Sequence, residues 1–335
     1  YSMSVNATPI ADSAGYSLGS AYDVGSIGSQ PTEDFSGSGY SDILFRNNTT
    51  GDMGWYIPPT STAAAGWKEF GATSSAYTIV GVGDFNGDGT ADILFRDNAN
   101  GSTGYIANHA NGTAASWYGF GTTSTAYSIA AVGDFNGDGT SDILFRNNAT
   151  GDAGIYLLNA SGANTWQGLG TTSLLYSTVG VGDFVGDGKQ QILFENMSNG
   201  NTGFYELGSN GNPGSWTNVF NANTAYSVVG TGDFNGDGIT DILYRNSSTG
   251  DMGYLAMGKG GTSFTWAGFG GTSTAWSVVG TGDYTGNGVS DILFRNNTTG
   301  DTGYLAPGIN GASNTWYELG VTSTAYSIIS SPTYG

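Results

Sequence analysis

The chain has 335 residues, a formal net charge of −19, 58 glycines and no cysteine. Abundant glycine together with many Tyr, Trp and Phe residues is typical of turn-rich β structure and argues against disorder. The acidity argues against nucleic acid as a partner, the absence of cysteine excludes disulfides, and no apolar run is long enough to predict a membrane span.

An acidic loop recurs along the chain. Its leading aspartates are spaced 50 residues apart, or 49 in one case: Asp34, Asp84, Asp134, Asp183, Asp233 and Asp283. A tryptophan keeps the same spacing, at Trp67, Trp117, Trp166, Trp216, Trp266 and Trp316. A period this long and regular indicates one supersecondary unit repeated. We place the full repeats of a single domain, 1–335, at residues 22–71, 72–121, 122–170, 171–220, 221–270 and 271–320.

Each repeat contains four predicted strands, as residues 126–175 illustrate. A first strand of small residues, the acidic loop, a second strand, a hairpin turn, a third strand, a polar turn and a fourth strand follow in order: 126–133, 134–142, 143–146, 147–152, 154–158, 159–164 and 165–169. Four short antiparallel strands in about 50 residues are typical of a propeller blade. The sequence therefore predicts an all-β fold, a β-propeller of four-stranded antiparallel blades.

The two ends of the chain read as parts of a blade. Residues 1–21 match third and fourth strands, and residues 326–330 match a first strand. We expect 1–21 and 321–335 to form a composite closing blade, giving seven blades and hiding open sheet edges. Six blades with frayed ends are the alternative. Because the chain begins at Tyr1 without Met, we expect a processed or trimmed product.

The acidic loops, numbered 1 to 6 after their repeats, place oxygen ligands at every second residue. This pattern is expected of a loop that wraps Ca²⁺, with glycines permitting the sharp turns. Loops 2, 3 and 5 have a complete set, in which the fourth member supplies its backbone carbonyl. The predicted ligands are Asp84, Asn86, Asp88, Thr90 and Asp92, then Asp134, Asn136, Asp138, Thr140 and Asp142, then Asp233, Asn235, Asp237, Ile239 and Asp241.

The other three loops depart from this set. Loop 6 has two carboxylates in place of three, so we expect weaker binding, and loop 1 is a marginal site. Loop 4, Asp183–Gln191, is predicted empty because Val185 and Gln191 replace ligands and Lys189 adds positive charge. The predicted ligands are Asp283, Thr285, Asn287, Val289 and Asp291 in loop 6, and Asp34, Ser36, Ser38, Tyr40 and Asp42 in loop 1.

We therefore predict three to five structural Ca²⁺ ions. Five ions would bring the net charge from −19 to −9. The alternative is a set of metal-free Asx turns, because Asp, Asn and Gly all favour tight turns.

The motif Asp-Phe-Asn-Gly-Asp-Gly-x-x-Asp-Ile-Leu-Phe, residues 84–95, resembles the FG-GAP repeat, also called the VCBS repeat. It is similar to calcium-binding blades of integrin α-subunit propellers and of fungal and bacterial propeller lectins. The resemblance covers nearly the whole chain. It implies a seven-bladed propeller with Ca²⁺ between the first and second strands of its blades. At the level of the fold, it also implies an extracellular protein, secreted or at the cell surface, that serves in adhesion or glycan recognition.

Two groups of residues are candidates for ligand binding. All five arginines follow the second strand, toward the face opposite the calcium loops: Arg46, Arg96, Arg146, Arg245 and Arg295. Arginine beside tyrosine and hydroxyls would suit a sugar; alternatively, each arginine holds a turn or a neighbouring blade. Trp55 and Trp276 stand where other repeats have Tyr or Ile, which makes them further candidates. The six repeated tryptophans would either stack on sugars or fill the space between blades.

Catalysis has little support in the sequence. His109 is the sole histidine and lies in a polar turn, where we interpret it as solvated; no nucleophile-elbow motif is present. We predict a non-enzymatic, calcium-stabilised extracellular propeller that binds glycans or glycoproteins through several weak sites. The alternatives are a protein-binding or structural module of a larger surface or matrix protein and, more distantly, a polysaccharide-active enzyme.

Overall fold

A computed structural model describes residues 33–59, 66–109, 116–208, 211–222, 224–309 and 313–329. These residues form 24 β-strands in six four-stranded antiparallel sheets. Within the described ranges, no helix has the length and apolar character needed to cross a membrane. The prediction of an all-β propeller with four-stranded antiparallel blades is confirmed.

Each sheet is one blade, and its strands run in order from the innermost to the outermost. Blade 1 consists of β24 (Tyr326–Ile329), β1 (Ile43–Asn47), β2 (Asp52–Ile57) and β3 (Gly66–Ala72). Blade 2 consists of β4 (Thr78–Gly83), β5 (Asp92–Arg96), β6 (Ser102–Ala107) and β7 (Ser116–Thr122). Blade 3 consists of β8 (Ser128–Gly133), β9 (Asp142–Arg146), β10 (Asp152–Leu158) and β11 (Asn164–Thr171).

Blade 4 consists of β12 (Tyr176–Gly182), β13 (Gln191–Asn196), β14 (Asn201–Leu207) and β15 (Pro213–Asn221). Blade 5 consists of β16 (Ser227–Gly232), β17 (Asp241–Arg245), β18 (Asp251–Met257) and β19 (Phe264–Gly271). Blade 6 consists of β20 (Ser277–Gly282), β21 (Asp291–Arg295), β22 (Asp301–Ala306) and β23 (Thr315–Val321).

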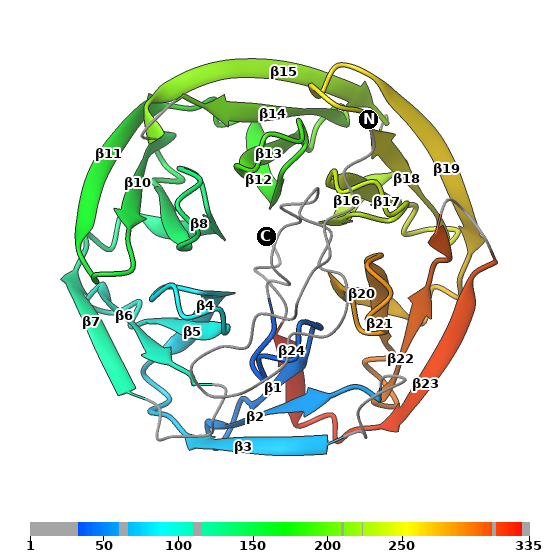
Figure 1. Ribbon diagram of the computed structural model, residues 1–335, viewed down its shortest axis with the longest axis horizontal. Coiled ribbons are helices and arrows are strands. Elements are labelled where there is room, and N and C mark those ends of the chain that lie inside the picture. Colours follow the sequence, from blue (N-terminus) through cyan, green and yellow to red (C-terminus); the bar gives the residue numbers. More distant parts are fainter. Residues whose placement is uncertain are drawn as a thin grey trace, which may run out of the picture.

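The blades stand around a central axis, with the first strand of each blade innermost and the fourth on the outer wall (Figure 1). Inner strands of successive blades approach closely, which explains their small residues. A Cβ atom added at Gly180 would lie 2.7 Å from the Cγ2 atom of Thr231, on the next inner strand. The Thr231 hydroxyl also donates to the carbonyl of Val181 at 2.8 Å. Larger side chains at such positions would push the blades apart.

The core lies between the blades. On β5, Leu94 packs with blade 3, whereas Ile93 and Phe95 pack with blade 1. A second strand is thus buried on both faces, which is why it reads as a continuous apolar run. Each of the six seams between neighbouring blades has its own cluster of this kind.

The expectation of seven blades is wrong for the described residues, which form six, the number of the alternative prediction. A ring of backbone hydrogen bonds joins the loops, because the amide of each loop's eighth residue bonds the leading aspartate's carbonyl in the preceding loop. The six donor–acceptor pairs are Ala91 to Asp34, Ser141 to Asp84, Gln190 to Asp134, Thr240 to Asp183, Ser290 to Asp233 and Ser41 to Asp283. The last pair sets loop 1 directly beside loop 6, so the ring closes without a further blade.

The C-terminal strand completes blade 1. In β24, Ile328 pairs with Phe45 and Ser327 pairs with Arg46 of β1. Residues 326–329 therefore supply the missing inner strand of the first repeat and do not start a seventh blade. Residues 1–21, which we assigned to the composite closing blade, lie outside the described residues.

Candidate functional site

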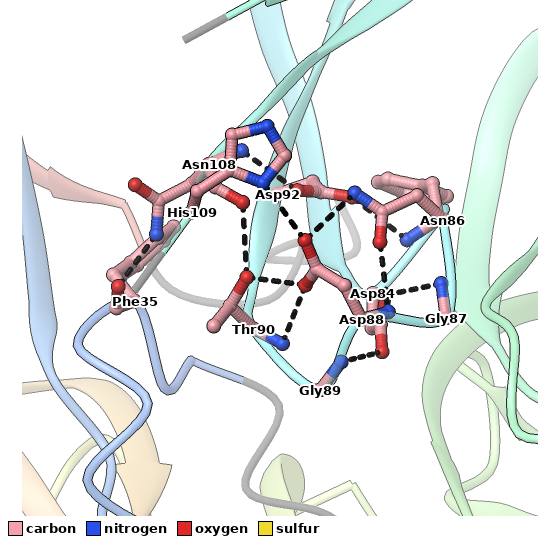
Figure 2. A network of polar contacts seen from close by, with 11 residues as sticks. Phe35, Asp84, Asn86, Gly87, Asp88, Gly89, Thr90, Asp92, Asn108 and His109 are labelled. Carbon is pink, nitrogen blue, oxygen red and sulfur yellow. Dashed lines mark hydrogen bonds and ion pairs between the residues drawn. The ribbon is translucent and has the colours of Figure 1, made fainter. Parts of the chain in front are cut away.

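The acidic loop of blade 2 folds around its first aspartate. The Oδ1 atom of Asp84 accepts hydrogen bonds from the amides of Gly87 at 2.6 Å and Asp88 at 3.2 Å, and its Oδ2 atom accepts from Gly89 at 2.8 Å (Figure 2). Gly87 and Gly89 have φ values of 72° and 82°, a conformation that suits glycine. The alternation of Asp and Gly therefore produces a tight cradle of oxygens.

The last aspartate of the same loop is fully buried. Asp92 Oδ2 accepts from the Phe85 amide at 3.0 Å, and Oδ1 accepts from the Asn108 amide at 2.9 Å. Burial, aided by the charges of Asp84 and Asp88 and opposed by these hydrogen bonds, raises the pKa of Asp92 to about 8. In loops 3, 5 and 6, burial likewise raises the pKa of Asp142, Asp241 and Asp291 to about 8.

Carboxylate, amide and backbone carbonyl oxygens at alternate positions fit Ca²⁺, and the buried negative charge would be compensated by such a cation. Within the described residues, however, no three acidic or histidine side chains converge in the arrangement of a metal centre. In loop 2 the side-chain oxygens instead accept backbone amides; for example, Asn86 Oδ1 accepts from Asp88 and Asp88 Oδ1 accepts from Thr90. The predicted ligands thus share one cradle, and calcium binding stays a prediction.

The same cradle is present in the other loops of the predicted set. The leading aspartate of each accepts the amides that follow it, namely Asp134 in loop 3, Asp233 in loop 5, Asp283 in loop 6 and Asp34 in loop 1. The shorter side chains of Ser36 and Thr285 donate to their own loop's leading aspartate, at 3.3 Å and 3.4 Å.

Loop 4 keeps the cradle but fills it differently. Gln191 Nε2 donates to the Lys189 carbonyl at 2.8 Å and to Asp187 Oδ1 at 3.4 Å. That carbonyl occupies the position of the predicted calcium-binding carbonyls. The Lys189 ammonium lies 3.7 Å from Asp187. An amide and an ammonium group therefore contact oxygens of loop 4, and the absence of a metal from this loop stays a prediction.

His109, which we interpreted as solvated, is 36% exposed and also contacts the acidic loop of its own blade. Its Nδ1 atom lies 3.1 Å from Asp88 Oδ2, so His109, just after β6, contacts loop 2 (Figure 2). The sequence gives no signal for this contact, because the two residues are 21 positions apart.

The arginines hold the connections between blades. Arg96 is 2% exposed and donates to the carbonyls of Ser124 at 3.1 Å and Tyr127 at 3.0 Å, in the segment that leads into blade 3. The other four arginines are also buried and bond the equivalent connections: Arg46, Arg146, Arg245 and Arg295. Burial leaves them little surface to offer a ligand, so their predicted ligand-binding role is corrected to the structural alternative.

The two out-of-register tryptophans differ. Trp55 packs between Phe35 and Phe70 in the seam of blades 1 and 2, with ring centroids 5.9 Å and 4.4 Å away, and its indole nitrogen is buried. This packing favours a structural role for Trp55, and its assignment as a ligand-binding residue stays a prediction. Trp276 is partly buried and lies beside Trp316, with centroids 5.5 Å apart and planes at 81°.

The six repeated tryptophans form a belt on the outer wall, one per blade. Each lies on a fourth strand and is 39% to 48% exposed: Trp67, Trp117, Trp166, Trp216, Trp266 and Trp316. Their inner edges pack over a glycine of the third strand and near an aromatic residue of the second, as Trp117 does with Gly104 and Phe95. Each tryptophan of the belt therefore packs within its blade and leaves part of its indole ring exposed.

A shallow hollow of about 290 Å³ opens beside this belt on blade 6. It is lined by Thr272, Ser273, Trp276, Phe294, Trp316 and Glu318. Glu318 accepts a hydrogen bond from the indole nitrogen of Trp316 at 3.0 Å. Two aromatic rings at a right angle, hydroxyls and a carboxylate thus meet in one open site. Sequence reasoning identified Trp276 here but missed Glu318, which lies two residues after a repeated tryptophan and is not marked by the repeat.

The profile of the FG-GAP-like repeat family matches residues 34–95, 84–145 and 233–294. The chain belongs to this family. No curated protein matches the sequence. Among solved structures, a protein from Lactobacillus plantarum is 15% identical with a TM-score of 0.49, over 84% of this chain and 83% of that one. A post-proline cleaving enzyme from Rickettsia typhi is 10% identical with a TM-score of 0.42; the match covers 86% of this FG-GAP propeller and 46% of the enzyme.

Proposed function

We propose that this FG-GAP propeller is a non-enzymatic, calcium-stabilised extracellular module that binds glycans. The observation that carries the proposal is the belt of six half-exposed tryptophans on the outer wall. Sugar rings stack on aromatic faces, and neighbouring hydroxyl and carboxylate groups fix their orientation. A site repeated around a ring also allows several weak contacts to act together on a branched or repeating ligand.

The hollow on blade 6 brings a second aromatic ring and polar groups to one member of this belt. Trp316 supplies the repeated platform and Trp276 adds a second wall, whereas the equivalent position in the other repeats is Tyr. Thr272, Ser273 and Glu318 provide polar groups at its rim. We expect this hollow to bind a sugar unit more tightly than the rest of the belt.

A glycan array probed with the calcium-loaded protein tests this function. Replacement of Trp316 by Ala should weaken binding to any glycan on the array by about 2- to 10-fold, because one aromatic contact is lost. Val321→Thr is the matched control, since Val321 is 70% exposed on the same strand and does not line the hollow. Binding that is unchanged by Trp316→Ala, or a blank array, would count against a glycan site here.

A second candidate function is recognition of a protein partner. Leu174, Leu175 and Met197 are 57%, 64% and 58% exposed at one end of blade 4, where Tyr176 pairs with Asn196. Most other repeats have Thr-Ala at the positions of the two leucines. An exposed apolar patch of this kind suits a protein surface.

Changing Leu174 to Thr and Leu175 to Ala restores the sequence of the neighbouring repeats. If the patch binds protein, this double variant should lose binding to a purified matrix protein that the parent chain captures, and its glycan array should stay unchanged. Equal capture by both proteins would argue against the patch as an interface.

A further inference from the structure

The last aspartate of a complete loop has both oxygens occupied by backbone amides. One oxygen accepts from the second residue of its own loop. The other accepts from an amide sixteen residues later, at the end of the third strand. This second bond measures 2.9 Å from Asn108 to Asp92, 2.8 Å from Leu158 to Asp142 and 2.8 Å from Met257 to Asp241.

Loops 1 and 6 cannot form this second bond. The residues sixteen positions after Asp42 and Asp291 are Pro58 and Pro307, and proline has no amide hydrogen. The Oδ1 atoms of both aspartates are buried and have no hydrogen-bond partner among the described residues. A buried carboxylate oxygen without a donor is costly to the folded state unless another positive group compensates it.

Loops 1 and 6 are neighbours in the ring although they belong to the first and the last repeat of the chain. The Ser41 amide donates to the Asp283 carbonyl at 2.9 Å, across the seam between blade 6 and blade 1. Beside the same seam, β24 closes blade 1 by pairing with β1. The two loops with unsatisfied carboxylates therefore flank the place where the ends of the propeller meet.

Further polar atoms are left without partners at this seam. Tyr284 replaces the Phe of the other loops, and its hydroxyl is buried without a partner in the described structure, as is the Ser41 hydroxyl. Both side chains lie against Gly282, where an added Cβ would be 2.6 Å from Ser41 Oγ and 3.4 Å from Tyr284 Cζ. The closing seam is thus more polar inside than a seam with phenylalanine.

We propose that the closing seam is the calcium-dependent part of the ring, because loops 1 and 6 use a bound divalent cation in place of the amides that Pro58 and Pro307 lack. When bound, the cation would compensate the negative charge of the buried Asp42 and Asp291 carboxylates. This inference rests on the proposed calcium binding. It deepens that proposal by assigning the largest structural effect to two particular loops.

Carboxylate count and structural need are separate quantities here. Loops 1 and 6 have fewer carboxylates than loops 2, 3 and 5, which predicts weaker affinity. Because their carboxylate oxygens lack a hydrogen-bond donor, we expect the folded state to lose more stability when these two loops release their ion than when loops 2, 3 and 5 do. On chelation, the seam between blades 6 and 1 should therefore loosen before the other five.

Hydrogen exchange of the full chain, with Ca²⁺ and with excess chelator, tests this directly. Chelation should reduce the protection of β1 and β24 amides by about 10-fold more than that of β9 and β17. If protection falls evenly over all blades, the proposed calcium stabilisation stands and the seam inference fails. If chelation changes neither exchange nor Tm, calcium stabilisation itself fails and the inference fails with it.

Proline substitutions give a matched test. Pro58→Ala and Pro307→Ala restore an amide donor, so each should reduce the chelator-induced loss of protection at the seam. Pro213→Ala, at the start of β15 and away from both loops, controls for the general effect of removing a proline. Asp42→Asn, which removes the buried charge without changing shape, should abolish the selective calcium response of the seam. The proposal would be overturned if the chelator-induced loss of protection at the seam were the same in Pro58→Ala, Pro307→Ala, Asp42→Asn and the parent chain.

Discussion

Each repeated tryptophan depends on a glycine in the neighbouring third strand. Six glycines lie beneath the indole rings, where an added Cβ would be 2.2 Å to 2.5 Å from the tryptophan Cζ2 atom: Gly54, Gly104, Gly154, Gly203, Gly253 and Gly303. Distances this short leave no space for a methyl group. The glycine of the third strand and the tryptophan of the fourth therefore form one packing unit.

Gly104→Ala should destabilise the protein by about 1–3 kcal/mol, because the new methyl group would displace Trp117 or the Tyr118 carbonyl. Denaturant unfolding measures the effect. Gly119→Ala in the adjacent strand is the control, since its Cβ would meet only Trp117 Nε1, at 3.4 Å. Equal losses of stability in the two variants would contradict this account of the packing.

Glu195 occupies the position that is arginine in the other five blades. It is 2% exposed and accepts a hydrogen bond from the Val228 amide at 3.2 Å. Burial raises the pKa of Glu195. The folded state therefore keeps this proton at pH values where the unfolded chain has released it. The resulting stability is present below the ordinary glutamate pKa and is lost as pH rises through the folded-state pKa.

Glu195→Gln keeps the hydrogen-bond acceptor and removes the titration. The variant should have a higher Tm than the parent chain at neutral pH, and the difference should disappear at acidic pH. Thermal melts across this range measure it. Parallel pH profiles for the two proteins would show that Glu195 does not carry this linkage.

At the scale of the element, the acidic loop combines an Asx cradle with a buried terminal aspartate. Loop 2 and loop 4 share the cradle, yet Gln191 replaces Asp92 at the end of loop 4 and bonds the Lys189 carbonyl. The same loop backbone therefore ends in a buried carboxylate in loop 2 and in a hydrogen-bonded amide group in loop 4.

Calcium stoichiometry distinguishes the two kinds of loop. Asp92→Asn should lower the number of bound Ca²⁺ ions by one, because loop 2 loses a charged ligand. Asp183→Asn in loop 4 should leave the number unchanged. Metal analysis after dialysis gives both values. Loss of an ion from the Asp183 variant would show that loop 4 binds metal.

Chelation should also lower the Tm of the parent protein, since an ion that binds only the folded state stabilises it by mass action. A thermal melt with and without excess chelator measures the shift. An unchanged Tm would contradict a structural role for calcium.

On the scale of the whole molecule, the described ring is closed by one antiparallel pair of strands. β24 is the inner strand of blade 1, and its Ile328 packs in the cluster that joins blade 6 to blade 1. Without β24, the buried edge of β1 would be exposed and the blade would lose its inner strand.

Removal of residues 326–335 should therefore abolish the single cooperative melt of the ring and promote aggregation. Size-exclusion chromatography and thermal unfolding detect both changes. Adding a peptide of residues 321–335 should restore part of the lost stability, because the strand is held without a covalent bond to β1. A truncated chain that melts like the parent would show that β24 is dispensable for closure.

The repeat, the four strands of a blade and the oxygen cradles could all be predicted from the sequence. These features depend on residues close together in the chain, such as Asp84 with Gly87 and Gly89, so the sequence pattern of each repeat predicts them directly. The same local information identified loop 4 as different, through Gln191 and Lys189.

Features that depend on contacts between blades emerged only in the folded molecule. Six blades form because β24 pairs with β1 and loop 6 bonds loop 1, and both contacts join residues far apart in sequence. For the same reason, the sequence did not predict the burial of Arg96 or the hollow that brings Trp276, Trp316 and Glu318 together: the contacting residues are far apart along the chain. A repeat fixes its own fold, whereas the number of blades and the surfaces between them follow from how the repeats pack.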